Sequence, residues 1–321
     1  MKKISTAFLS LLIILLLSPS SPAFDGPLQM KNQFPLFIHT DAPPLDKASI
    51  EDSITASLSY SSVYLVRDSS FWSVDLDMEI AELNLKVKKT VKDFIELAVD
   101  VPILSFNSGF MDDFVDGYHS AFGFPDYGRS SRPDNEFLYE VRRNGRLIVK
   151  GETGRVGIGD IRLTLKKPLM KGDPAISIKG DVELPTGDAK SGYGSGSIDA
   201  GISLLFDKKL SEAFKTYSNI GVVFPGALRG HERVGLKDFI YGGAAVEAAF
   251  WKDISLLGQV FIQGSPLPET DIGPVDRTAV LLSLGGRYYS GNNSFELSFT
   301  EDPNTSGAPD FTLNFSFKSR F

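Results

Sequence analysis

Phe311-Thr-Leu-Asn-Phe-Ser-Phe-Lys-Ser-Arg-Phe321 is the last stretch of the sequence, and it is the most informative about the fold. Its residues alternate between apolar and polar, and alternation with period two predicts a β-strand with one apolar face. The apolar members are Phe311, Leu313, Phe315, Phe317 and Phe321. A soluble edge strand would rarely leave so much phenylalanine in water, so this face must be buried against another surface.

The beginning of the chain predicts export. Lys2 and Lys3 precede an apolar run over residues 4–17, and Ser21 and Ala23 form a small-residue cleavage pattern. This is the layout of a secretory signal peptide that is cleaved near Ala23. The apolar run is shorter than the roughly 20 residues that a membrane-spanning helix needs.

Together with an export signal, the terminal strand resembles the assembly signal of bacterial outer-membrane barrels. The residues that carry this resemblance are Phe315, Phe317 and Phe321. It implies a bacterial outer-membrane location, with the barrel-assembly machinery, outer-membrane lipid and lipopolysaccharide as partners.

The same alternation recurs along the chain. It is cleanest in 54–64, 95–103, 161–165, 176–184, 198–206 and 280–288, and weaker in 214–224, 239–250, 254–264 and 295–300. Most of these runs have roughly the nine to eleven residues that a tilted strand needs to cross a bilayer. Residues 72–89 change phase, because apolar residues stand at even positions up to Ile80 and at odd positions from Leu83. Two strands, or one strand with a bulge, would produce this change.

Connection lengths decide between these two interpretations. If 72–89 is one bulged strand, long and short connections alternate after the first pair. A barrel with periplasmic termini, short periplasmic turns and longer external loops requires this alternation. We therefore predict an all-β fold, a transmembrane antiparallel β-barrel of about 12 strands over residues 53–321. The alternative is a secreted two-sheet sandwich, whose loops need not alternate in length.

Composition excludes several classes of protein. The 321 residues include 33 Lys and Arg against 40 Asp and Glu, a formal charge of −7. This balance gives no basic excess for binding nucleic acid. The absence of cysteine excludes disulfide scaffolds, thiol catalysis and Cys-ligated metals. A hydrophobic content of 42% excludes a disordered chain.

The predicted domain organisation has three parts. Residues 1–23 are the signal peptide, and residues 53–321 are the barrel. Residues 24–52 are rich in Pro and have no strand pattern, so they form either an N-terminal periplasmic segment or a plug of the lumen. The sequence leaves both open.

The connection 106–156 does not fit the ladder of strands. Phe110, Phe114, Tyr118 and Phe122 recur at every fourth position, which predicts a short amphipathic helix over 109–122. An aromatic face of this kind should pack into the barrel mouth or against its rim. We therefore expect 106–156 to be a long external loop that constricts or caps the barrel.

The opposite side of this helix carries a candidate functional cluster. Asp112, Asp116 and His119 share a face, which is compatible with a metal or acid–base site. It is equally the pattern of a solvated face whose aspartates favour the helix dipole. Arg129 is the fourth candidate, and further arginines make the loop locally basic. They predict either contacts with lipopolysaccharide phosphates or ordinary solvated charge.

The segment Ser108–Arg129, SGFMDDFVDGYHSAFGFPDYGR, resembles the hallmark of an uncharacterised proteobacterial family classified as a domain of unknown function. Three further motifs resemble those of the family and follow in the same order: Asn32-Gln33-x-Pro35-Leu36, Gly157-x-Gly-Asp160 and Leu184-Pro-Thr-Gly-Asp188. The resemblance covers most of the mature chain. It implies an outer-membrane protein and supplies no activity, ligand or catalytic residue.

Two classes of function remain at this point. The first is a non-enzymatic barrel, either a narrow channel or uptake protein for a small solute or a structural envelope protein with a blocked lumen. The second is an outer-membrane lipid hydrolase, suggested by His119-Ser120 beside Asn135. Lipid hydrolases of this kind place the nucleophile two residues after the histidine, and that position is Ala121. We expect no enzyme activity, cofactor or metal, and the sequence does not give the oligomeric state.

Overall fold

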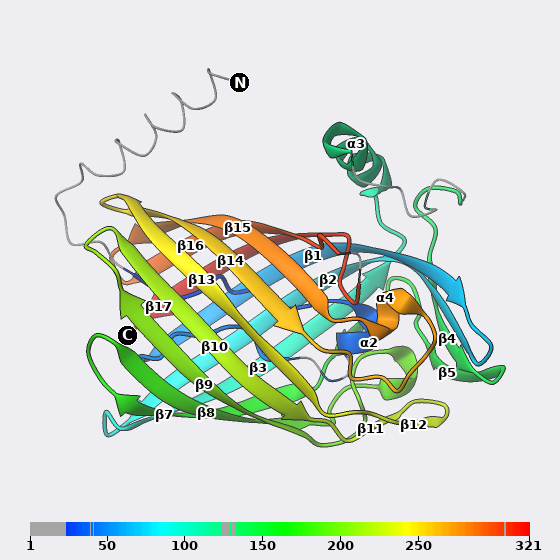
Figure 1. Cartoon of the computed structure of the whole chain (residues 1–321), viewed down its shortest axis with the longest axis horizontal. Helices are drawn as coiled ribbons and strands as arrows, with labels where there is room; N and C mark the ends of the chain where they lie inside the picture. Colours follow the sequence, from blue (N-terminus) through cyan, green and yellow to red (C-terminus); the bar gives the residue numbers. More distant parts are fainter. Residues whose placement is uncertain (1–23, 39, 41, 124–128, 130–131, 305) are drawn as a thin grey trace.

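The computed structural model describes residues 24–321 except 39, 41, 124–128, 130–131 and 305; the predicted signal peptide lies outside this part. The chain forms a closed antiparallel barrel of 12 strands, which confirms the predicted fold. The barrel closes between its first and last strands, which pair from Ser53↔Arg320 to Ser62↔Phe311. Figure 1 shows the barrel from the side, with the described chain ends and the short turns at one end and the long loops at the other.

The wall strands, in the order in which they pair around the barrel, are β1 (Ser53–Asp68), β2 (Trp72–Val91), β3 (Ile95–Asn107), β7 (Ile161–Met170), β8 (Ala175–Leu184), β9 (Asp199–Lys209), β10 (Phe214–Phe224), β13 (Phe239–Trp251), β14 (Ile254–Gln263), β15 (Ala279–Ser290), β16 (Asn293–Glu301) and β17 (Phe311–Arg320). The remaining elements belong to the N-terminal segment or the long loops: α2 (Pro35–Ile38), α3 (Asp112–Phe122), β4 (Leu138–Arg143), β5 (Arg146–Lys150), β6 (Val156–Ile158), η2 (Ala189–Ser191), β11 (Ala227–Arg229), β12 (Arg233–Gly235) and α4 (Gly273–Asp276). Within the described residues, no helix is long and apolar enough to cross a membrane.

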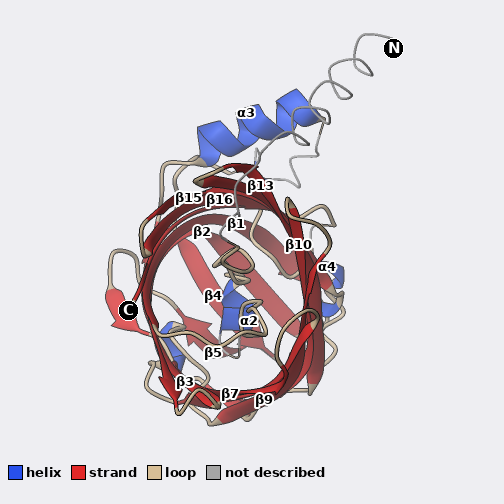
Figure 2. Ribbon diagram, turned by 90° about the vertical axis from the view of Figure 1, so that its left-hand side faces the viewer, coloured by secondary structure: helices blue, strands red, loops and turns tan. Residues whose placement is uncertain are grey.

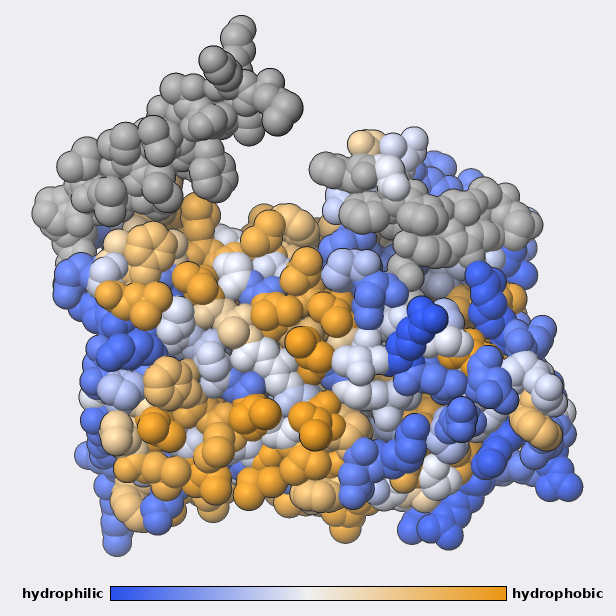
Figure 3. Space-filling view, viewed as in Figure 1, coloured by the Kyte–Doolittle hydropathy of each residue, from blue (hydrophilic) through white to orange (hydrophobic). Residues whose placement is uncertain are grey.

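The wall has the two faces that the alternation predicts. Along β17, Leu313 and Phe315 are exposed on the outside, whereas Asn314 and Ser316 are buried in the lumen. In Figure 3 apolar side chains gather over the half of the molecule near the short turns, and hydrophilic ones dominate the long-loop end. The apolar half is therefore the membrane-facing belt.

The phase change in 72–89 has a different origin from the predicted bulge. β2 is one strand, and its pairing with β1 runs without a register shift from Ser53↔Lys88 to Asp68↔Ser73. Even-numbered residues of β2 face inward throughout. Near the short turns these are polar, as at Glu82, whereas near the long loops they are apolar, as at Leu76 and Ile80. The polarity of the two faces changes and the geometry does not.

The helices α2 and α3 lie on opposite sides of the wall. Figure 2 looks into the barrel and shows α2 inside the ring of strands and α3 outside it. Inside the long-loop end, α2 contributes to an apolar core with residues of β2 and β3, among them Leu76, Ile80 and Phe106. The lumen therefore changes from a charged interior near the short turns to an apolar core near the long loops.

Candidate functional site

The described part of the N-terminal segment (residues 24–52) lies inside the barrel. Its first residues ascend from the short-turn end, α2 forms its tip near the long loops, and the chain then descends to Ser53 at the start of β1. Leu28, Phe37 and Leu45 are among the most completely buried side chains of the protein. The lumen is thus occupied by the chain's own beginning.

The ascending limb is held by charges on the last strands. Asp25 pairs with Lys318 and Arg320, each at 2.8 Å. Arg287 of β15 donates to the carbonyl oxygens of Gly26 at 2.9 Å and Pro27 at 3.1 Å. The same guanidinium is neutralised by two buried carboxylates, Glu247 at 2.9 Å and Glu296 at 2.5 Å. Buried charges are tolerated only when paired in this way, because an unpaired one is strongly destabilising.

The descending limb meets the opposite wall through Asp46. Its two carboxylate oxygens pair with Lys88 at 2.8 Å and with Lys166 at 3.1 Å. Lys166, which has no exposed surface, also donates to the carbonyl oxygens of Lys47 and Ser49 at 3.0 and 3.1 Å. One lysine of β7 therefore fixes both the side chain and the backbone of the segment.

Glu51 completes the charged contacts near the short turns. It lies 2.6 Å from Lys47 and 3.1 Å from Lys318. Burial acts to raise the pKa of Glu51, but Lys318, Lys47 and Lys88 outweigh it and lower that pKa to about 2. Glu51 therefore stays ionised wherever these lysines remain beside it.

The tip of the segment is held differently, through the predicted family motif at Asn32–Leu36. Asn32 donates to the carbonyl oxygen of Gly307 at 2.6 Å, and Gln33 donates to Glu82 at 3.1 Å. Gly307 has a φ of 62°, and a Cβ there would lie 2.4 Å from the ring of Phe37. The tip therefore packs closely against the loop 302–310, and this contact requires glycine.

Little space remains beside the segment at mid-height. Two voids between it and the wall measure about 20 and 10 Å³, and both are lined by Lys31 and Pro44. A void needs roughly 10–15 Å³ to hold one water molecule, so these hold about one each. A larger cavity of about 300 Å³ lies at the short-turn end, against Ala48, Ser49 and Ile50. The two voids at mid-height are therefore much smaller than the cavity at the short-turn end.

The predicted cluster on α3 is only partly brought together. Asp112 and Arg129 form a buried ion pair, and Arg129 also pairs with Asp310. Asp116 is half-buried on the same helix, and the side chain of His119 lies outside the described residues. Among the described residues, no group of His, Asp and Glu has the arrangement of a metal site. Asp112 is held by Arg129 and by the backbone N–H of Asn135 at 2.6 Å, so it joins α3 to the loop that follows.

Of the two predicted positions for α3, the barrel mouth and its rim, the structure shows the rim. Met111 and Val115 form its buried face and contact Phe311 of β17 and Tyr60 of β1 on the outside of the wall. Of the predicted aromatic face, Phe110 is 72% exposed and Phe114 is 52% exposed. Phe110 stacks on Tyr60 with 5.3 Å between ring centroids, so α3 lies against the outer rim and does not enter the mouth.

The N-terminus of α3 is fixed by a residue that the sequence did not single out. Glu79 of β2 accepts hydrogen bonds from the backbone N–H groups of Phe110, at 2.8 Å, and Met111. Gly109 is required just before it, because it has a φ of 80° and a Cβ there would overlap Glu79. A carboxylate at a helix start is favourable because it meets the unpaired N–H groups.

Two other family motifs bind each other. Asp160 accepts from the backbone N–H groups of Gly187 at 2.8 Å and Ser195 at 2.7 Å, and Thr186 donates to the carbonyl oxygen of Gly159 at 2.7 Å. Burial raises the pKa of Asp160 to about 6, although these backbone N–H groups oppose the rise. Since the contacts are internal, these motifs fold the loop between β8 and β9.

The basic character of the long loop is largely neutralised within the protein. Arg132 pairs with Asp77 at 2.9 Å, and Arg146 pairs with Glu232 at 3.1 Å. Arg143 stacks over Trp72 with its guanidinium 5.3 Å from the ring centroid. The Asn144-Gly145 turn beside it has positive φ at both residues, as a type I′ hairpin turn requires.

Comparisons with known proteins agree with this architecture. The chain is similar to a solved structure described as the COG4313 outer membrane channel from Pseudomonas putida F1, with a TM-score of 0.56 and 12% identity over 87% of this chain and 97% of that one. It also matches the NanC porin, with a TM-score of 0.46 and 7% identity over 84% of this chain and 98% of that one. At these identities the first similarity establishes the fold alone. No curated protein matches the sequence. The family model described as a protein of unknown function, DUF3187, matches residues 5–321, and the chain belongs to that family.

Proposed function

We propose that this protein is an outer-membrane channel for small solutes that its N-terminal segment keeps closed. The observation that carries the proposal is the type of contact inside the lumen. The segment is held near the short turns by ion pairs, such as Asp46 with Lys88 and Lys166. Ion pairs can be exchanged for water when the segment moves, because every charge involved becomes hydrated. A lumen built only to be filled could be packed with apolar side chains at no loss of stability.

The wall behind the segment supports the same proposal. Its lumen-facing charges include pairs that do not involve the segment, such as Lys86 with Asp100 at 2.7 Å and Arg162 with Glu183 at 3.1 Å. These would line a polar path once the segment is displaced. The short-turn end, which we expect to face the periplasm from the alternation of loop lengths, already has a cavity of about 300 Å³ beside the descending limb.

The experiment is single-channel recording in planar bilayers. The full mature chain should be closed for most of the recording, and a variant lacking residues 26–50 should give a steady conductance. Asp46→Asn, which removes the charge shared by two lysines, should give intermittent openings of the same size. Glu212→Gln, at an exposed ion pair with Lys209, is the matched control and should behave as the unmodified chain.

Assembly must be checked independently, by the shift in gel mobility that folded barrels show on heating. If the shortened chain assembles and stays silent at all voltages, the channel proposal is wrong. The protein is then a structural envelope protein with a blocked lumen. The outer-membrane hydrolase receives no support from the geometry, because Ser120 is an exposed residue of α3.

A further inference from the structure

The barrel wall is incomplete at one place near the long loops. β1 pairs with β17 only up to Ser62, where the backbone N–H of Asp310 donates to the Ser62 carbonyl at 3.0 Å. β1 then continues for six residues to Asp68, about 20 Å of strand. Over this length it remains paired with β2 on one side. On the other side, within the described residues, no strand pairs with it. The loop before β17 begins there, with Asp310 bonded to Ser62.

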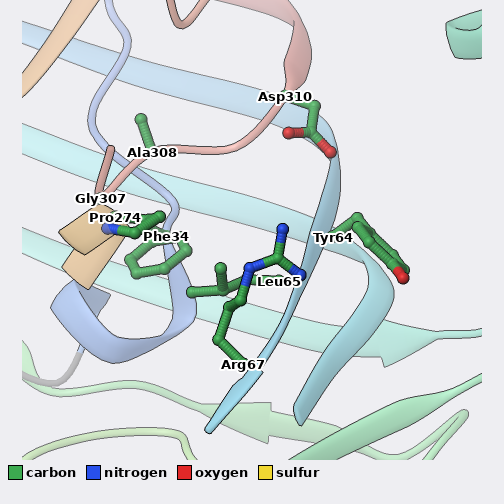
Figure 4. Close-up of a pocket in the computed structure, with 8 residues that line it drawn as sticks. All are labelled: Phe34, Tyr64, Leu65, Arg67, Pro274, Gly307, Ala308 and Asp310. Carbon is green, nitrogen blue, oxygen red and sulfur yellow. The ribbon is translucent and has the colours of Figure 1, made fainter. Parts of the chain in front are cut away.

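A small pocket occupies this gap, which we call the window. It is lined by Phe34, Tyr64, Leu65, Arg67, Pro274, Gly307, Ala308 and Asp310. Tyr64 stands on the outward face of β1, whereas Leu65 and Arg67 stand on its lumen face. Figure 4 shows Phe34 and Pro274 on one side, with the Arg67 side chain reaching toward Leu65 and the space below Asp310. The window thus lies between Tyr64, on the outward face of β1, and Phe34 at the tip of the N-terminal segment.

The window lies at the edge of the membrane-facing belt. Directly below it, Leu58 and Leu313 are exposed on the outer face. Just beside it, α3 rests on Tyr60 and Phe311, with Phe110 and Phe114 exposed. Aromatic side chains at this level are typical of the boundary between acyl chains and head groups. Apolar solutes concentrate at that boundary and not in the water above the barrel mouth.

A single guanidinium joins the parts around the window. Arg129 pairs with Asp112 of α3 and with Asp310 of the loop, and it lies 5.4 Å from the ring centroid of Tyr64 on β1. Arg129 is buried, so losing it would leave two carboxylates without their shared partner. We refer to this group as the latch.

We propose that the window is a lateral entrance and binding site for small, mainly apolar molecules that partition into the outer leaflet, and that the latch holds it shut. The inference rests on the proposed function, since it names the solute class of that channel. The pocket measures about 60 Å³, room for a few water molecules, so a solute can enter only when the latch opens and the window widens. The apolar lining residues Phe34, Leu65, Pro274 and Ala308 and the position at the edge of the membrane-facing belt favour a mainly apolar solute. Arg67 and Asp310 leave room for a polar group on it.

The chain has no cysteine, so a single introduced cysteine reports access to one place. Ala308→Cys places a thiol in the window. Ala175→Cys is the matched control, because Ala175 is equally buried, at 7% exposure, and lines the cavity at the short-turn end. Both variants are prepared as full chains in lipid nanodiscs. Each is labelled with N-benzylmaleimide, which partitions into lipid, and with a sulfonated maleimide, which does not.

A lateral entrance predicts that the ratio of apolar to charged labelling rates is at least tenfold higher at position 308 than at position 175. Adding Arg129→Gln should raise the apolar rate at 308 at least threefold and leave 175 unchanged. Arg146→Gln, at an exposed arginine of the β4–β5 hairpin, should change neither rate.

Equal ratios at the two positions would overturn the proposal, because they would mean access through water. Absence of labelling at 308 with either reagent, in both the Ala308→Cys chain and the chain carrying Arg129→Gln, would overturn it as well. If Arg129→Gln prevents assembly, Asp310→Asn takes its place with the same expectation. These readouts need no ion current, so a silent channel in planar bilayers and a failed lateral entrance are separate results.

Discussion

The two halves of strand β2 carry opposite polarity on one continuous backbone. Near the short turns, Glu82 and Lys86 face inward, while Leu83 and Leu85 face outward. Near the long loops, Leu76 and Ile80 face inward, while Asp77 and Glu79 face outward. Lipid surrounds the first half, and water and α3 surround the second. Hydrophobic alternation therefore reports the medium on each side of a strand. Where the apolar residues of a strand move from its outward to its inward face, the strand leaves the membrane.

The largest expected effect comes from the inward face of the upper half. Leu76→Ala removes a side chain with no exposed surface from the apolar core and should destabilise the protein by about 2–5 kcal/mol. Ser57→Ala, inward in the lower half, loses a hydrogen bond with Ser316 and should cost only about 0.5–1.5 kcal/mol. Denaturant unfolding of the barrel in lipid vesicles measures both. If the two substitutions reduced the free energy of unfolding equally, the interior near the long loops would not differ in polarity from the interior near the short turns.

The outward face should respond in the opposite order. Leu85→Arg places a charge against acyl chains and should cost about 2–4 kcal/mol. Val66→Arg lies on the outward face of the upper half, opposite Asp75 of β2, and should change stability by less than about 1 kcal/mol. The same unfolding measurement applies. A large penalty at Val66 would place the membrane boundary higher along β1 than the change in polarity does.

The wall could be predicted from sequence because its determinants are local. Outward apolar residues such as Leu313 and Phe315 alternate with lumen residues, and loop parity fixed the strand number. The bulge predicted in β2 was wrong. The shift of the apolar residues from even to odd positions reflects a change in the surroundings of the strand, and the backbone has no extra residue there. That Phe315, Phe317 and Phe321 guide assembly stays a prediction.

The contents and surroundings of the barrel could not be predicted in the same way. In the N-terminal segment, backbone groups bond to side chains of distant strands, as when Leu28 donates to Gln259 at 3.0 Å and Gln29 donates to Glu296 at 2.8 Å. Such contacts leave no periodic pattern. The predicted aromatic repeat of α3 does contact the wall, since Phe110 stacks on Tyr60 and Phe114 lies beside Phe311. The repeat did not include Met111 and Val115, which are buried at the same contact. Aromatic residues beside lipid have no need to be buried in protein.

The smallest expected effect uses acid to separate the two halves of the lumen. The pKa of Glu51 is about 2 beside its lysines, against an ordinary value of 4.5 once the segment is released. A carboxyl whose pKa is lowered by docking stabilises the docked state fully above pH 4.5, and that contribution is lost as the pH falls from 4.5 toward 2. Between pH 7 and pH 3.5 the protonation of Glu51 should therefore weaken the docking equilibrium about tenfold. The side chains of Phe34 and Phe37, which pack the described part of the tip, do not titrate, so acid should loosen the limbs before this packing.

Open probability in planar bilayers measures this loosening, and it should rise between pH 4.5 and 3.5 while staying constant between pH 7 and 5. Glu51→Gln should open more often at pH 7 and lose part of the rise. The rest remains because the carboxyls of Asp25 and Asp46 also dock the segment. Against the effect of burial, Lys318 and Lys47 lower the pKa of Asp25, and Lys166 and Lys88 lower the pKa of Asp46. Glu212→Gln is the control and should keep the profile of the unmodified chain. If Glu51→Gln retains the full acid response, the charged contacts near the short turns are not what holds the segment. The apolar half of the lumen would then have to hold it alone, through the packing of Phe34 and Phe37 against the loop 302–310.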